Sequence, residues 1–196
     1  MNRGRRIFLS ILSCLIFVGF SIATFSLETL IALHEKVSLI YLDNLKTTIG
    51  KQVQAHLEKR GLTSQTIEKF RLGYSLKQAE SLLKQVRSMG EKSEVMRQSG
   101  LFIDTERGYM DRFRGRIMFS IADVSGKIIA FAGRVFESEE PAKYVNSPET
   151  PIYHKSRILY GIHASKQAIR KNNSVIVVEG YFDFLQLFQS GIENCV

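Results

Sequence analysis

The C-terminal segment Ser174–Val196 constrains the fold more than any other stretch of this sequence. Ser174–Val178 is a short apolar run typical of a buried strand, and a helical pattern follows from about Phe182 to Gln189. The final residues, GIENCV, are expected to start a second strand parallel to the first. This order is the first half of a βαβ unit, so an α/β arrangement is predicted at this end of the chain.

Two carboxylates stand where the predicted strand meets the helix. Glu179 follows the strand directly, Gly180 allows a tight turn, and Asp183 lies one turn into the helix. Ligands of open α/β sheets bind outside the carboxyl ends of the strands, and paired carboxylates can hold Mg²⁺. The alternative is a solvated acid at the strand end and an acid favoured by the helix dipole. The spacing alone leaves both interpretations open.

The region before this segment combines helices with a β-hairpin. Apolar residues at three- and four-residue steps predict helices from Phe25 to about Arg97. One helix is expected to end at Gly61, the next to start with Thr63 or Ser64 as its N-cap, and a third to run from about Ser75 to Met89, ending at Gly90. The stretch RIMFSIADVSGKIIAFAGRVF predicts two strands joined by a turn, with alternate residues of the first on one face: Ile117, Phe119 and Ile121.

The three prolines of the chain fall between Pro141 and Pro151, and they predict a long loop. The stretch SRILYGIHASKQAIRKNN after it has a helical pattern. Loops of this kind often carry function. Basic and polar residues in this loop and its flanks would suit the binding of a triphosphate near a carboxylate site. These residues are Arg134, Lys143, Asn146, Lys155 and Arg157.

The net charge of +8 favours a polyanionic partner, either nucleic acid or an anionic membrane surface, although a merely basic globular protein is the plain alternative. Arg112, Arg114 and Arg116 alternate, so a strand here would line them along one face. Such a stripe suits phosphate binding, and a solvated charged edge is the alternative. The two cysteines exclude a four-cysteine zinc cluster.

The N-terminal residues differ in character from the rest. Three arginines precede a stretch without charge from Ile7 to Leu27, which is long enough to cross a bilayer and also resembles a signal peptide. This stretch raises the possibility of a membrane-tethered protein. The residues after this stretch argue against a protein located outside the cytoplasm.

Several blocks resemble the catalytic core of bacterial DNA primase of the DnaG type, in the same order along the chain. RGLTSQTIEKFRLGY is similar to its RGL…I..F.LGY opening, and YMDRFRGRIMFSIADVSGKIIAFAGRV to YDRFRNRIMFPI.D..G.VIGFGGRV. AKYVNSPETPIYHKSRILYG is similar to PKYLNSPET.LFHKGR.LYG, and VVEGYFDFLQLFQSGIEN to VVEGYMDV..L.QAGI.N. The resemblance covers roughly residues 25–196. Ser120 and Ala132 depart from the usual proline and glycine.

The resemblance implies a mixed α/β fold: an α+β N-terminal part followed by a Rossmann-like TOPRIM domain that is truncated here. We expect residues 1–26 to be an apolar leader of unassigned role, either a transmembrane or signal-like segment or the product of a disrupted reading frame. Residues 27–170 are expected to form the N-terminal part of the catalytic core, and 171–196 the start of TOPRIM. A strand and helix alone would leave Val175, Val177 and Phe184 short of neighbours.

The resemblance also implies function. A primase copies single-stranded DNA into short RNA primers during replication by metal-dependent nucleotidyl transfer from ribonucleoside triphosphates. Glu179 and Asp183 would be catalytic residues and ligands for Mg²⁺ or Mn²⁺. The residues expected to face nucleotide and template are Arg112, Arg114, Arg116, Arg134, Lys143, Asn146 and Lys155.

Other parts of the family pattern are expected to lie outside this sequence: the DxD metal ligands, the zinc ribbon with its zinc ion, and the domain that binds the replicative helicase. The chain alone is therefore expected to be inactive, and a nucleic-acid-binding remnant without turnover is the alternative function. The expected location is the cytoplasm, or a membrane if residues 7–27 span it.

Overall fold

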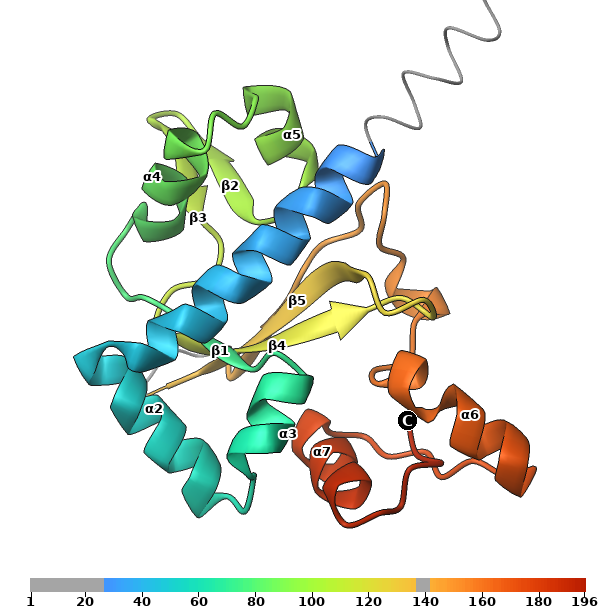
Figure 1. Cartoon of the computed structure of the whole chain (residues 1–196). Coiled ribbons are helices and arrows are strands. Elements are labelled where there is room, and N and C mark those ends of the chain that lie inside the picture. Colours follow the sequence, from blue (N-terminus) through green and yellow to red (C-terminus); the bar gives the residue numbers. More distant parts are fainter. Residues whose placement is uncertain (1–26, 137–141) are drawn as a thin grey trace, which may run out of the picture.

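The computed structural model describes residues 27–136 and 142–196 (Figure 1). Residues 27–43 are helical and cross the middle of the molecule. The other helical elements are η1 (Asn44–Lys46), α2 (Thr48–Lys59), α3 (Ser64–Lys69), α4 (Ser81–Ser88), α5 (Ser93–Gln98), η2 (Lys155–Arg157), α6 (Ile162–Asn172) and α7 (Tyr181–Gln189). The expected leader, residues 1–26, lies outside the described residues.

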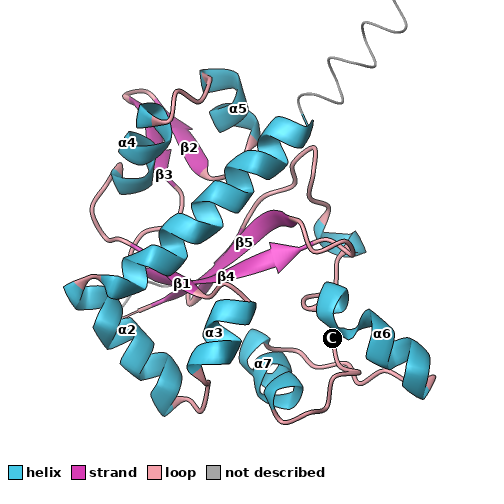
Figure 2. Ribbon diagram, viewed as in Figure 1, coloured by secondary structure: helices cyan, strands magenta, loops and turns pink. Residues whose placement is uncertain are grey.

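An antiparallel sheet of four strands forms the centre, in the order β1-β4-β5-β6 (Figure 2). Its strands are β1 (Gly73–Ser75), β4 (Arg116–Ala122), β5 (Ile128–Val135) and β6 (Tyr144–Asn146). A separate two-stranded sheet pairs β2 (Phe102–Thr105) with β3 (Gly108–Asp111). The predicted hairpin is confirmed as β4 and β5, and the mixture of helices with antiparallel sheets confirms the α+β expectation.

The central sheet is buried on both faces. Ile117, Phe119 and Ile121 of β4 lie in one hydrophobic cluster together with residues of α2, α3 and α7. Met118 lies in a second cluster, which residues of helix 27–43 and α4 complete. Because side chains alternate along a strand, every residue of β4 is buried on one side or the other. The shared face of Ile117, Phe119 and Ile121 is therefore confirmed.

The boundaries of the predicted helices are partly right. Gly61 has φ +87 just after α2, and the Thr63 side chain caps α3 by accepting from the Thr66 amide, as expected. The helix predicted to begin at Ser75 is wrong, because Ser75 belongs to β1 and α4 begins later. Pairing of β1 with β4 satisfies the backbone there, so tertiary contacts override the helical pattern.

A distant residue fixes the start of α4. The Asp111 carboxylate, at the end of β3, accepts hydrogen bonds from the amides of Leu82 and Leu83 at 2.8 and 2.9 Å. These first-turn amides have no partner within their own helix, so Asp111 acts as a cap supplied from another element. A local sequence pattern cannot predict a cap that comes from a residue so distant in the chain.

Two further boundaries differ from the prediction. The predicted loop between Pro141 and Pro151 contains the short strand β6, which pairs with β5. The helix predicted from about Ser156 starts later, at Ile162, because Gly161 precedes it with φ +78 and interrupts the helical path.

The C-terminal segment pairs as expected but is not buried as expected. Ile176 bridges Cys195 in the parallel sense, and the Val196 amide donates to the Ile176 carbonyl at 2.9 Å. Residues 175, 176 and 177 are 48%, 41% and 70% exposed, so the predicted buried strand was wrong, whereas the expectation that Val175 and Val177 would lack neighbours is confirmed. Phe184, expected to lack neighbours, is 1% exposed and packs against Gly161.

Across residues 27–136 and 142–196 the structure contains no helix of the length and apolar character needed to cross a membrane. The apolar stretch considered as a possible span, residues 7–27, lies outside the described residues except for Leu27.

Candidate nucleotide and metal site

The two candidate carboxylates flank the turn that starts α7. Glu179 is exposed beside Gly180, and Asp183 is exposed in the first turn of the helix. A Cβ atom added to Gly180 would lie 2.6 Å from the Asp183 carboxylate, so this carboxylate folds back over the glycine backbone. A side chain at this position would displace it. The turn therefore keeps both acids at one end of α7.

The end of the central sheet adjoins this turn. Tyr181 stacks on Phe119 of β4, with ring centres 4.9 Å apart, and its hydroxyl donates to the Asn146 side-chain oxygen at 3.3 Å. Burial raises the pKa of Tyr181 to about 12, so the hydroxyl remains a donor at neutral pH. Arg134 of β5 pairs with Tyr144 of β6 in register. Two predicted residues, Arg134 and Asn146, are thus brought to the start of α7.

The pKa of Tyr144 depends on three nearby charged groups. Burial raises the pKa of its hydroxyl, the positive charges of Arg134 and Arg60 oppose that rise, and the negative charge of Asp183 adds to it. Charged groups affect a pKa in this way only from nearby. Two cations and one carboxylate therefore lie near Tyr144.

Arg60 is a residue of this site that the sequence analysis did not single out. Its guanidinium carbon lies 4.3 Å from the ring centre of Phe182 in α7, and its carbonyl oxygen accepts from the Gln186 side chain at 2.8 Å. Arg60 closes α2, far from the other residues in sequence. The available signal was its place at the head of the RGL block that resembles the family.

The arginine stripe predicted from Arg112, Arg114 and Arg116 does not form. The first two lie in a bend between β3 and β4, because Gly115 has φ +62 and interrupts any strand. The Arg112 side chain donates to the Gly100 carbonyl at 2.8 Å, and burial lowers its pKa. Arg116 is 4% exposed and donates to the Ala142 carbonyl at 3.0 Å. Two of the three are thus engaged with backbone oxygens.

The two predicted lysines are exposed on either side of β6. The carbonyl of Lys143 accepts a hydrogen bond from the Val135 amide at 2.9 Å, and the residue is exposed to solvent. Lys155 lies in η2, and its amide donates to the Glu149 carboxylate at 2.9 Å. The structure therefore fixes their backbones and leaves their charged ends available.

The carboxylates are an incomplete metal site by themselves. Among the described residues, no three histidine, cysteine, aspartate or glutamate side chains gather closely enough to hold a metal ion. Glu179 and Asp183 nevertheless offer exposed oxygen donors at one turn, which is the donor type that Mg²⁺ takes, and Mg²⁺ usually needs few protein ligands. They fit one weakly held ion.

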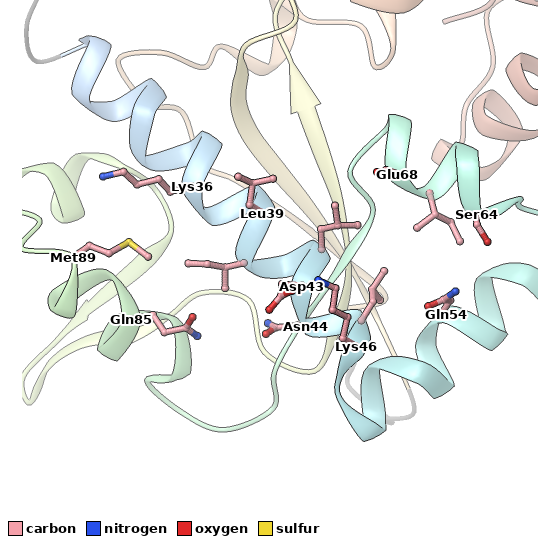
Figure 3. Close-up of a pocket in the computed structure, with 14 residues that line it drawn as sticks. Lys36, Leu39, Asp43, Asn44, Lys46, Gln54, Ser64, Glu68, Gln85 and Met89 are labelled. Atoms are coloured by element: carbon pink, nitrogen blue, oxygen red, sulfur yellow. Dashed lines mark ion pairs between the residues drawn. The ribbon is translucent and has the colours of Figure 1, made fainter.

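A groove of about 740 Å³ lies elsewhere, between helix 27–43, α2, α3 and α4 (Figure 3). Leu39 and Met89 border it with exposed side chains, and an ion pair of 2.6 Å joins Asp43 to Lys46 beside it. None of the predicted site residues lines it. Volume alone therefore does not locate the candidate site.

Comparison with known proteins identifies the family. Residues 40–166 match the family model described as the N-terminal domain of the DNA primase catalytic core. The chain is 36% identical over 170 residues to the DNA primase of Escherichia coli K12, which covers 86% of this chain and 29% of that protein. It is 43% identical over 144 residues to the primase of Pseudomonas aeruginosa, covering 72% and 21%.

Solved structures agree. The RNA polymerase domain of Mycobacterium tuberculosis primase DnaG superposes with a TM-score of 0.81 at 29% identity, covering 86% of this chain and 55% of that one. A DnaG catalytic domain bound to single-stranded DNA gives 0.78 at 35% identity, covering 88% and 54%. The chain spans less than a third of the length of the two curated primases compared here. It belongs to the bacterial DnaG-type DNA primases, and its matched part is the N-terminal domain of their catalytic core.

Proposed function

We propose that this chain is part of a primase that copies single-stranded DNA into RNA primers by metal-dependent nucleotidyl transfer. One observation carries the proposal: Arg60, Arg134 and Asn146 converge on the start of α7, where Glu179 and Asp183 flank a glycine. These residues come from α2, β5, β6 and α7. Cations that meet beside exposed carboxylates suit a metal-bound triphosphate, because the cations neutralise part of the phosphate charge and the carboxylates can hold the metal ion.

Each residue has a task in this proposal. The guanidinium forks of Arg60 and Arg134 bind phosphate oxygens, Asn146 orients the nucleotide, and Lys143 and Lys155 add charge from the flanking loops. Glu179 and Asp183 would hold Mg²⁺ or Mn²⁺. When bound, the metal would supply further positive charge at the phosphates.

We propose that residues 1–196 alone bind these ligands without turnover. Two metal ions beside a triphosphate need several carboxylates, whereas the described site offers two. The alternative considered from the sequence, nucleic-acid binding without membership in a primase, is not favoured by the family match.

The remaining partners follow from the family and are part of the proposal. The template is single-stranded DNA, the substrates are ribonucleoside triphosphates, and the replicative helicase and a zinc ribbon belong to the longer enzyme. The solved DnaG catalytic domain bound to single-stranded DNA shows this template class for its own protein. The proposed location is the cytoplasm, and the proposed TOPRIM start is residues 171–196.

Ligand binding tests the proposal directly. The affinity for ATP is measured by calorimetry with and without Mg²⁺, and the affinity for single-stranded DNA by fluorescence anisotropy. Glu179→Gln keeps the shape and removes the charge, so we expect loss of the Mg²⁺-dependent part of ATP binding with DNA affinity nearly unchanged. Asp104→Asn removes an exposed acid from the other sheet and is the matched control.

The lysines give a second contrast. Lys143→Ala and Lys155→Ala are expected to weaken ATP binding more than DNA binding. Equal losses for both ligands would make them a general basic surface. Unchanged Mg²⁺ dependence in Glu179→Gln would remove that carboxylate from the site.

A further inference from the structure

Two arginines share one aromatic ring beside the candidate site. The guanidinium carbon of Arg60 lies 4.3 Å from the ring centre of Phe182, and that of Arg134 lies 5.8 Å from the same centre. Both distances fall within the range in which a cation is attracted to the face of an aromatic ring. The two cations are far apart in the sequence, one at the end of α2 and the other in β5.

Both guanidinium groups lie near one ring, and like charges that share a site repel each other. The ion pairs found among the described residues include neither Arg60 nor Arg134. Phe182 is 6% exposed and its ring meets Phe119 edge-on at 5.4 Å, so the ring itself cannot move away. A buried ring that attracts both cations offsets part of any repulsion between them.

The backbone of Arg60 is held to the same helix. Phe182, Gln186 and Gln189 lie on one face of α7 at i, i+4 and i+7. Gln186 donates to the Arg60 carbonyl at 2.8 Å and Gln189 donates to the Gly61 carbonyl at 2.8 Å. Gln189 also accepts from the Thr63 amide at 2.7 Å. The turn after α2 is thus hydrogen-bonded to α7, and the Phe182 ring lies beside the guanidinium group of Arg60.

We infer that Phe182 is a positioning residue that holds Arg60 beside Arg134, so that the pair receives adjacent oxyanions of a polyphosphate. The inference rests on the proposed function for its ligand, and it assigns a task to a residue that donates no hydrogen bond itself. The inferred role needs no contact between the Phe182 side chain and the ligand. It acts through the orientation of two guanidinium groups, which bind phosphates best when their planar forks are prearranged.

Fluorination of the ring separates this role from packing. Site-specific replacement of Phe182 by mono-, di- and trifluorinated phenylalanine weakens the negative face of the ring with little change in shape. We expect the affinity for inorganic triphosphate to fall stepwise, by about three- to tenfold for the trifluorinated form. The thermal unfolding midpoint should stay nearly constant through the series, which a merely structural role would not explain.

Phe188 provides the matched control. It lies in the same helix, is 7% exposed and also carries a cation, with the Lys69 nitrogen 4.2 Å from its ring centre. Its fluorination should leave triphosphate affinity unchanged. Constant affinity through the Phe182 series, or an equal decline through the Phe188 series, would overturn the inference.

A readout without ligand separates the inference from the proposed function. In the free protein, the Nε resonance of Arg60 should carry a ring-current shift that Phe182→Leu removes. If the unmodified chain binds no triphosphate, the proposed function fails. The positioning of Arg60 is then decided by this resonance, and an identical shift in Phe182→Leu would overturn it.

Discussion

The β4–β5 hairpin and the segment 174–178 have similar apolar sequences and opposite environments. Every residue of β4 is buried, whereas Val177 in SVIVV is 70% exposed. The hairpin has strands on both of its edges and helices over both faces. Segment 174–178 has one short parallel neighbour among the described residues. An apolar sequence therefore favours burial, but its side chains are buried only where neighbouring elements cover them.

The largest effect is expected from removing a ring in the hairpin. Phe131 in β5 is fully buried, stacked on His34 and edge-on to Tyr41. Phe131→Ala should lower the free energy of unfolding by about 3–5 kcal/mol, because it removes buried apolar surface and leaves a cavity. Chemical denaturation measures the change. A loss below about 1 kcal/mol would mean that the hairpin is no better packed than segment 174–178.

The glycine that precedes α6, Gly161, tests how firmly the C-terminal part is docked. A Cβ atom at Gly161 would lie 1.9 Å from the Phe184 ring, and φ there is +78. We expect Gly161→Ala to cost roughly 2–4 kcal/mol, from the left-handed backbone together with displacement of the ring. Gly191→Ala is the control, since φ is +92 and nothing lies within 4 Å. It should cost only about 1–2 kcal/mol. Equal costs would show that Phe184 yields freely.

Acid should lower the stability of the folded protein through His34. Burial lowers the pKa of this fully buried ring, and its Nδ1 atom lies 2.8 Å from the Leu30 carbonyl oxygen. The unfolded chain therefore takes up the proton first as pH falls below about 6.5, and stability is lost with a slope of up to about 1.4 kcal/mol per pH unit. His34→Gln should flatten this slope, and His154→Gln, at an exposed position, should not. Denaturation between about pH 5 and 8, about 1.5 units either side of the ordinary value, measures both.

The smallest effect is expected in the exposed segment. Val177→Thr should change the free energy of unfolding by less than about 0.5 kcal/mol, because the side chain is already in water. A loss above about 1 kcal/mol would show that segment 174–178 is covered in solution, and the contrast with β4 would then disappear.

Local patterns predicted local features well. The stop at Gly61, the Thr63 cap, the β4–β5 hairpin and the start of α7 each depend on a few adjacent residues, so they could be predicted. The arginine stripe failed because alternation implies one face only if the backbone is a strand, and Gly115 bends it. Arg60 was missed because its partner, Phe182, is far away in sequence.

The sequence by itself determined the family, the hairpin, and the glycine turn with its two carboxylates. These rest on short-range backbone preferences and on ordered motifs that survive without knowledge of packing. The tertiary structure decided the rest: β1 instead of a helix at Ser75, Asp111 as a remote cap, and two arginines over one ring. Each of these joins residues distant in the chain, and their interaction energy exists only after folding has brought them together.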